Sequence, residues 1–186
     1  MRRLLMMLLM VILAYNASAQ TSIGSWVRFP NNALLGQSFK PQLAFAILDD
    51  EEMIALRMIC PDNYATFDNE SRLLIKFEDD SVTTLPIYFD VGVVKDYSTD
   101  YNSTLGFVEF HITLTLYKLD SQTKEAIVED GKKIKKIRVV ETNGDINDYD
   151  ISPNYQQKLI YGLQKSYKDV IAEQQQRQFN DSDAGF

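Results

Sequence analysis

Residues 43–58, LAFAILDDEEMIALRM, place two apolar runs on either side of four consecutive carboxylates. Large apolar side chains occupy every second position of each run, and the parity reverses across the carboxylates. A period of two predicts two strands, and a hairpin centred on Asp50-Glu51 puts both apolar sets on one face of a sheet. The predicted register pairs Leu43 with Met58, Phe45 with Leu56, and Ile47 with Ile54.

The four carboxylates from Asp49 to Glu52 are interpreted as the solvated turn of this hairpin, because aspartate in turns hydrogen-bonds to nearby backbone. The alternative is a calcium site, since carboxylates are ligands that Ca²⁺ prefers. The spaced acids and the glycine of a common calcium loop are missing from this stretch. The sequence therefore predicts a structural turn and no metal site.

A second hairpin with an acidic turn is predicted in residues 71–89, SRLLIKFEDDSVTTLPIYF. Pro86 is expected at a strand edge, because proline has no N–H to donate to a ladder. The pairs expected from a three-residue connection are Ile75 with Leu85 and Leu73 with Ile87.

A third hairpin is predicted at Asn143-Gly144, a dipeptide typical of tight hairpin turns. A three-residue connection that includes Asp145 aligns the flanking apolar positions better than a two-residue turn does. The pairs expected from it are Val139 with Tyr149 and Ile137 with Ile151.

Residues 106–119, GFVEFHITLTLYKL, form the clearest single strand of the sequence. Strict alternation gives this strand an apolar face and a polar face, and the polar face is expected to contact solvent. The apolar face would carry Val108, Phe110, Ile112, Leu114 and Leu116. The polar face would carry Glu109, His111, Thr113 and Thr115.

Two helices are predicted. The stretch 121–130, SQTKEAIVED, fits a short helix with Ser121 as its N-cap. A second helix begins at Ser152 and Pro153, which are typical N-cap and first-turn residues. Its apolar stripe stops near Ala172 and consists of Tyr155, Leu159, Leu163, Tyr167, Val170 and Ile171.

These elements predict an α+β fold. An antiparallel sheet of about 6–8 strands would be built from hairpins, with the long C-terminal amphipathic helix packed on one face. A single domain is expected over 20–175, after a signal peptide at 1–19 and before a polar disordered tail at 176–186.

Residues 1–19 have the organisation of a secretory signal peptide. Arg2 and Arg3 precede an apolar run of eleven residues, Leu4 to Ala14, and Ala17-Ser18-Ala19 fits the cleavage pattern. A membrane-spanning helix is the alternative, but it needs about 20 apolar residues. Cleavage after Ala19 would remove 19 of the 186 residues, leaving 167, and would change the net charge from −7 to −9 because two arginines are lost.

The charge and the cysteine content restrict location and partners. Nucleic acid binds basic surfaces, so this acidic chain is not expected to bind it. After cleavage the sequence predicts no integral membrane segment. Cys60 is the only cysteine and cannot form an internal disulfide, whereas a secreted animal domain of this size often contains several. The sequence therefore indicates an exported bacterial protein of the periplasm or the extracellular space.

No recognisable catalytic set is found in the sequence. Nucleophilic catalysis by serine or cysteine most often uses a histidine base, and His111 is the only histidine. One histidine and one cysteine cannot form a usual structural zinc site, and the eight glycines are scattered rather than grouped in a phosphate-binding loop. No cofactor is expected. A hydrolase that uses paired carboxylates is the enzymatic alternative.

Aromatic side chains in two predicted loops, 61–70 and 94–104, are the candidate interaction residues. Exposed tyrosines are common at interfaces, although these rings could instead cover the ends of the sheet. The candidates are Tyr64, Phe67, Tyr97 and Tyr101. A separate candidate is Ser81, because Asp80-Ser81-Val82 resembles a short acceptor for O-glycosylation of exported bacterial proteins.

Three segments resemble a family of uncharacterised small bacterial proteins, many of them exported. The resemblance implies an exported domain of sheet and C-terminal helix, and it implies no activity. Ser81 and Asp145 stand where such relatives often have glycine in their turns. The segments are LLIKFEDDSVTTL (73–85), KKIKKIRVVETNGDINDYDI (132–151) and KLIYGLQKSY (158–167).

The function expected from the sequence is that of an exported, non-catalytic domain that binds a protein or a glycan through its long loops. A periplasmic immunity or inhibitor protein is the specific alternative within this class, since complementary charge speeds the capture of a basic enzyme. The alternative from another class is the carboxylate-dependent hydrolase.

Overall fold

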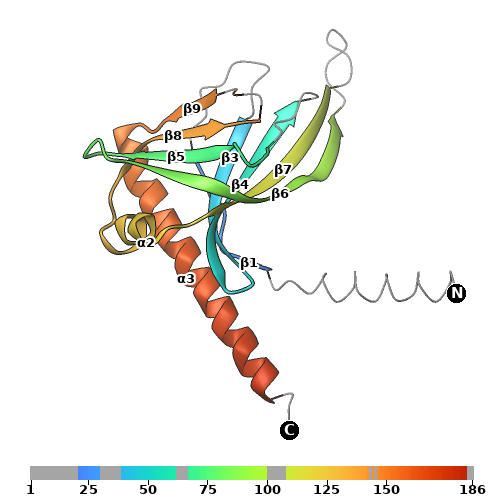
Figure 1. Ribbon diagram of the computed structural model, residues 1–186, viewed down its shortest axis with the longest axis vertical. Coiled ribbons are helices and arrows are strands. Elements are labelled where there is room, and N and C mark those ends of the chain that lie inside the picture. The colour runs from blue at the N-terminus through green and yellow to red at the C-terminus, as the bar shows by residue number, and fades with distance from the viewer. Residues whose placement is uncertain are drawn as a thin grey trace, which may run out of the picture.

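The structure of the protein is a computed structural model that describes residues 21–29, 39–61, 67–99, 108–142, 144 and 146–183. These residues form an α+β fold in which the long C-terminal helix α3 (Pro153–Asp183) lies across one face of an antiparallel sheet (Figure 1). This confirms the predicted fold class. The expected signal peptide, 1–19, lies outside the described residues and stays a prediction.

Nine strands of the described chain form the sheet, in the order β1-β3-β4-β7-β6-β5-β8-β9, with β2 also paired to β3. The count exceeds the prediction because two short strands precede the first predicted hairpin. The strands are β1 (Thr21–Ile23), β2 (Val27–Arg28), β3 (Phe39–Leu48), β4 (Glu51–Pro61), β5 (Arg72–Phe77), β6 (Val82–Thr99), β7 (Val108–Lys118), β8 (Ile134–Val140) and β9 (Ile146–Asp150).

The main core lies between α3 and the sheet. The alternating apolar residues of the first hairpin enter it as predicted, namely Leu43, Phe45, Ile47, Ile54, Leu56 and Met58. The second and third hairpins contribute in the same way, through Leu73, Ile75, Leu85, Ile137 and Val139. From the helix, Leu159, Leu163 and Val170 are fully buried against them.

The register of the first hairpin differs from the prediction by two residues. Phe45 pairs with Ile54, and Leu48 pairs with Glu51. Only Asp49 and Asp50 connect the strands, with φ of 51° and 64°, as required by the two-residue turns that fit the twist of a hairpin. A shift of two residues keeps every side chain on its face, so the predicted faces are right although the predicted pairs are wrong.

The other two hairpins show the same shift. Leu73 pairs with Leu85 rather than with Ile87, and Ile137 pairs with Tyr149 rather than with Ile151. In each case the turn begins earlier than alternation alone suggests. Pro86 is the last residue of β6 to pair with β5, and pairing with β7 starts one residue later. Pro86 therefore marks the change of partner within an interior strand, not an edge strand as predicted.

Replacing Asp50 with glycine is expected to stabilise the protein by about 1 kcal/mol, because glycine adopts a positive φ without the steric cost that other residues meet. Urea denaturation of residues 20–186 measures this change. Glu51→Gly is the matched control, since Glu51 lies in β4, where glycine costs about 0.5–1 kcal/mol. If both substitutions destabilise equally, the turn geometry is wrong.

The short helix after β7 differs in detail from the prediction. It consists of α2 (Ser121–Lys124) followed by a π-helical turn, η1 (Glu125–Glu129). The N-cap is Asp120 rather than Ser121, because the Asp120 carboxylate accepts a hydrogen bond from the Thr123 N–H at 2.7 Å. Helix α3 begins at Pro153 as predicted and continues to Asp183. Residues 176–183 are thus helical rather than an irregular tail, and 184–186 lie outside the described residues.

Helix α3 passes close to the backbone at Gly24, directly after β1, where an added Cβ would lie 2.1 Å from the Ser166 carbonyl oxygen. The Ser166 hydroxyl, buried on α3, accepts a hydrogen bond from the backbone N–H of Phe45 at 2.9 Å. Gly24 in turn donates its N–H to the Phe45 carbonyl at 2.9 Å. One residue of β3 therefore joins the N-terminal segment, the sheet and the helix.

Candidate functional site

The described part of the structure does not bring the four aromatic candidates together in one exposed surface. Phe67 is half-buried and packs against the main core. Tyr97 belongs to strand β6, which continues to Thr99, so the predicted loop at 94–104 is wrong in its first half. Tyr64 and Tyr101 lie outside the described residues, as does the side chain of Tyr97.

Ser81 is exposed at the turn of the second hairpin, where its side chain and its N–H both donate hydrogen bonds to the Asp79 carboxylate. These bonds, together with the nearby Lys132, lower the pKa of Asp79 to about 2. The hydroxyl of Ser81 is accessible but already engaged. O-glycosylation of this residue stays a prediction.

Both acidic turns are held by neighbouring cations. In the second turn, Asp80 lies between Lys76 at 2.8 Å and Lys135 at 3.1 Å. In the first turn, Glu52 forms an ion pair with Lys124 at 2.7 Å and accepts a hydrogen bond from the Tyr167 hydroxyl at 3.0 Å. Within the described part of the chain, no group of three or more acidic, histidine or cysteine side chains could hold a metal ion. These contacts favour the structural interpretation of the turns.

The two faces of β7 are the reverse of the prediction. Thr113 and Thr115 are buried at 2% and 1% exposure, on the side of the sheet that packs against α3. Tyr117, two residues further, lies in the main core and pairs with Ile54. Ile112, Leu114 and Leu116 therefore point to the opposite face of the sheet, which we call the open face, whereas the side chains of residues 108–111 lie outside the described ones. The face predicted to contact solvent is the covered one.

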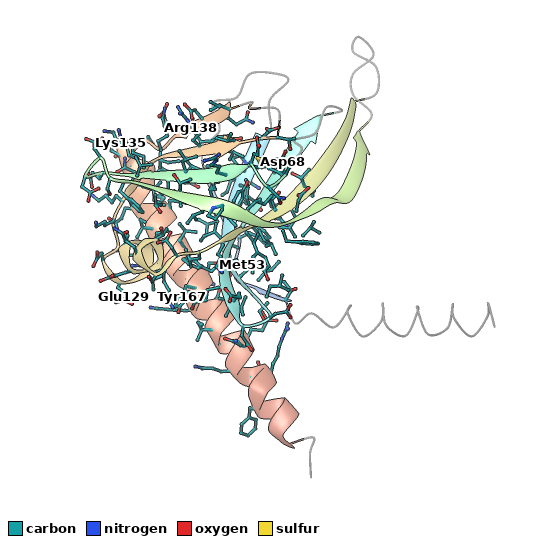
Figure 2. All side chains as sticks on the ribbon, in the orientation of Figure 1. Met53, Asp68, Glu129, Lys135, Arg138 and Tyr167 are labelled. Atoms are coloured by element: carbon teal, nitrogen blue, oxygen red, sulfur yellow. The ribbon has the colours of Figure 1, made fainter. Side chains whose placement is uncertain are left out.

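A second, smaller cluster of buried side chains lies on the open face. It consists of Ala46, Met53, Ala55 and Leu116, and the half-buried residues around it are Ile23, Trp26, Leu48 and Leu114. Met53 lies near β1, far from Lys135 and Arg138 at the β8 end of the sheet (Figure 2). Two of the four buried side chains are alanines, and these short side chains leave a depression in the middle of this face.

An apolar groove of about 570 Å³ lies above this cluster, a size within the usual range for ligand sites. Strand β1 contributes to one wall and β6 to the other, so the groove spans the curved first half of the sheet. The described lining residues are Thr21, Ile23, Leu48, Asp49, Tyr88, Phe89, Val91, Leu114 and Leu116.

Irregular pairing of β6 with β7 exposes the aromatic wall of the groove. The register shifts between Ile87 and Phe89 and again between Asp90 and Gly92. A bulge adds one unpaired residue and redirects side chains. Tyr88, Phe89 and Val91 are consequently 44%, 56% and 41% exposed. The sequence carries a signal for this, since IYFDVGVV at 87–94 loses the alternation that the other strands keep.

The two ends of the groove differ in chemistry. Beyond the lining residue Leu114, which pairs with Arg57, the Arg57 guanidinium lies over the Trp26 ring, 4.5 Å from its centroid, and Arg57 also donates a 3.1 Å hydrogen bond to the Gln42 side chain. At the other end is the exposed carboxylate of Asp49.

A second hollow, of about 310 Å³, lies over β5 and β8. Its rim carries cations, including Lys135 and Arg138 (Figure 2). Arg138 binds both carboxylate oxygens of Asp148, at 2.6 and 2.8 Å, and Lys136 contacts Asp148 and Asp150. These cations already have anionic partners, so the hollow offers little to an anionic ligand.

Five carboxyl groups of the described residues have a pKa that departs clearly from its ordinary value. All five pKa values are shifted downward. Hydrogen bonds from Lys76 lower the pKa of Asp80, and those from Arg138 lower the pKa of Asp148. A carboxyl that donates a proton near neutral pH needs a raised pKa. The full set with lowered pKa values is Asp79, Asp80, Asp120, Asp148 and Asp169.

Comparison with known proteins adds no relative: no protein-family model, no curated protein and no solved structure matches the chain. The family resemblance of the three segments therefore stays a prediction from the sequence. Among the helices of the described residues, none has both the length and the hydropathy of a membrane span.

Proposed function

We propose that the chain is an exported, non-catalytic binding domain whose site is the open-face groove, and that its ligand is an apolar segment of another protein. The observation that carries this proposal is the exposure of Tyr88, Phe89 and Val91 beside the apolar groove. Contiguous exposed apolar surface of this kind commonly marks an interaction site.

The chemistry of the lining favours a protein segment over a glycan. Aliphatic side chains and Phe89 make up most of the groove, and they offer a sugar no hydrogen-bond partner. Protein interfaces are instead enriched in aromatic residues around a core with few charges. The proposed site is thus on the open face rather than in the predicted loops. The proposed class of function is still the predicted one, a non-catalytic binding domain.

An inhibitor or immunity protein is one form that this binding could take, because an acidic domain attracts a basic enzyme over long range. The hydrolase alternative has less support. It requires two carboxyl groups with different pKa values around one cleft. Among the described lining residues of the groove, Asp49 is the one that carries a carboxyl group.

Phe89→Ser is expected to weaken binding of apolar peptides at least tenfold, since an exposed aromatic anchor commonly contributes about 2 kcal/mol to binding. Peptides selected from a displayed random library on immobilised residues 20–186 supply the ligand, and isothermal titration calorimetry measures its affinity. The melting temperature should not change, because Phe89 is 56% exposed.

Tyr161→Ser is the matched control for this experiment. Tyr161 is 64% exposed on α3 and lies outside the groove lining. The proposal is wrong if both variants bind the selected peptides as tightly as the unchanged protein. It is also wrong if the purified protein turns over a glycan or a peptide and a single acidic substitution removes that activity without unfolding.

A further inference from the structure

Asp49 is the one charged side chain among the nine described residues that line the groove. It is exposed at the turn between β3 and β4, at the end of the groove away from Trp26. A carboxylate at the end of an apolar groove attracts a cationic group on the ligand and repels an anionic one.

The other carboxylates of this turn are already bound within the protein. Asp50 accepts a hydrogen bond from Gln174 on α3 at 3.0 Å. Glu51 pairs with Lys118 at 3.4 Å, and Glu52 pairs with Lys124 at 2.7 Å. Within the described chain, Asp49 alone of the four has no side-chain partner. Its charge is therefore left for a ligand.

The charge of the whole chain acts in the same direction. The net charge is −7, and it would be −9 after loss of the two N-terminal arginines. A negative field of this size raises the local concentration of cationic ligands and lowers that of anionic ones. A fatty acid or an anionic lipid also matches the apolar lining, but Asp49 and the net negative charge would repel its head, and the Arg57 guanidinium already contacts Trp26 and Gln42.

We propose that the groove binds a basic apolar segment, in which a lysine or arginine adjoins the apolar side chains and its cation contacts Asp49. This inference rests on the proposed function of the groove and specifies its ligand. The apolar residues of the segment would lie against the exposed lining residues Phe89 and Val91. The basic residue sets the direction of the segment, because only one end of the groove presents a free carboxylate.

The fluorescence of Trp26 can be used to measure binding in the groove. This residue is the only tryptophan of the chain and packs against the cluster beneath the groove, so its fluorescence is expected to change when the groove is filled. The probes are two synthetic peptides of leucine and phenylalanine, one flanked by lysines and the other by glutamates. Sodium oleate is a third probe. The lysine peptide is expected to bind most tightly, and its advantage should shrink as salt is added.

Asp49→Asn is expected to weaken binding of the lysine peptide about threefold, as for the loss of one exposed ion pair. Asparagine tolerates a positive φ at least as well as aspartate, so the turn is kept. Glu78→Gln is the matched control, because it makes the same change of charge in the other acidic turn. Its effect on binding should be smaller than that of Asp49→Asn.

Phe89→Ser separates this inference from the proposed function. If Phe89→Ser leaves the affinity for the lysine peptide unchanged, the groove is not the binding site and both proposals are wrong. Suppose instead that Phe89→Ser removes binding. If the unchanged protein then binds the lysine and glutamate peptides equally, or if Asp49→Asn has no more effect than Glu78→Gln, the groove is a binding site but the inference of a basic ligand is wrong. Tighter binding of oleate than of the lysine peptide also overturns the basic partner.

Discussion

Gly24→Ala is expected to destabilise the protein by about 3 kcal/mol, at the upper end of the range for overpacked sites. A methyl group on Gly24 would lie 2.1 Å from the backbone carbonyl oxygen of Ser166 and 2.7 Å from its hydroxyl oxygen. The carbonyl belongs to helix α3 and has no rotamer that could relieve the contact. The helix would have to move away from the sheet and lose the buried hydrogen bond between Ser166 and Phe45. Urea denaturation of residues 20–186 measures the loss.

Gly162→Ala is the matched control. A methyl group there would lie 2.6 Å from a side-chain carbon of Val27, and Val27→Ala removes that carbon. Gly162→Ala combined with Val27→Ala should therefore restore much of the stability that Gly162→Ala alone loses, since the two changes act at one contact. No such compensation is available at Gly24. A Gly24→Ala variant as stable as the unchanged protein would show that α3 does not approach the sheet this closely.

Alternation in the sequence determines which face of a strand is apolar but not its register. In all three hairpins the predicted pairs are displaced by two residues, and in all three the faces are correct. Burial has a period of two, so it cannot distinguish registers that differ by two. The turn makes that distinction. Asp49 and Asp50 both adopt a positive φ, although neither is the glycine that usually signals such a turn.

The reversed faces of β7 have a different cause. Strict alternation predicts a half-buried strand whose polar face contacts solvent. Both faces of the second half of this strand carry buried side chains, with Thr113, Thr115 and Tyr117 on the side of α3 and Leu116 in the cluster on the open face. Thr115 is accommodated in the main core because its hydroxyl donates a hydrogen bond to the Asp90 carboxylate at 3.1 Å. Polar side chains with such partners can lie inside, and residue type alone does not reveal the partner.

The candidate site was not predictable from single residues. The predicted candidates were tyrosines in polar loops, whereas the groove is formed by residues of β1, β3, β6 and β7 that are far apart in the sequence. Only the loss of alternation between Ile87 and Val94 pointed to it, because consecutive apolar residues in a strand cannot all face one core. Strand order, which brings β1 and β6 to the two walls, follows from long-range pairing that the sequence pattern does not specify.

Phe45→Ala is expected to cost about 4 kcal/mol, within the range measured when a buried aromatic side chain is truncated. Phe45 is 1% exposed. Its ring meets that of Tyr167 edge-on, with centroids 5.2 Å apart, and such pairs add to the free energy gained from burial. Alanine would leave a cavity between β3 and α3 at the point where Gly24 and Ser166 also meet. Calorimetry should show the melting temperature falling by roughly 10 °C for a domain of this size.

Phe89→Ala provides the internal control, since the same atoms are removed from the same sheet. Phe89 keeps 56% of its surface exposed, so its truncation should change the free energy of unfolding by less than about 0.5 kcal/mol. The two substitutions are thus expected to have opposite profiles in the stability assay and in the peptide-binding assay. Phe45→Ala should lower stability, and Phe89→Ala should lower only the affinity for peptides. A large loss of stability from Phe89→Ala would mean that its ring is buried within the fold, and the open-face groove would then not be available to a ligand.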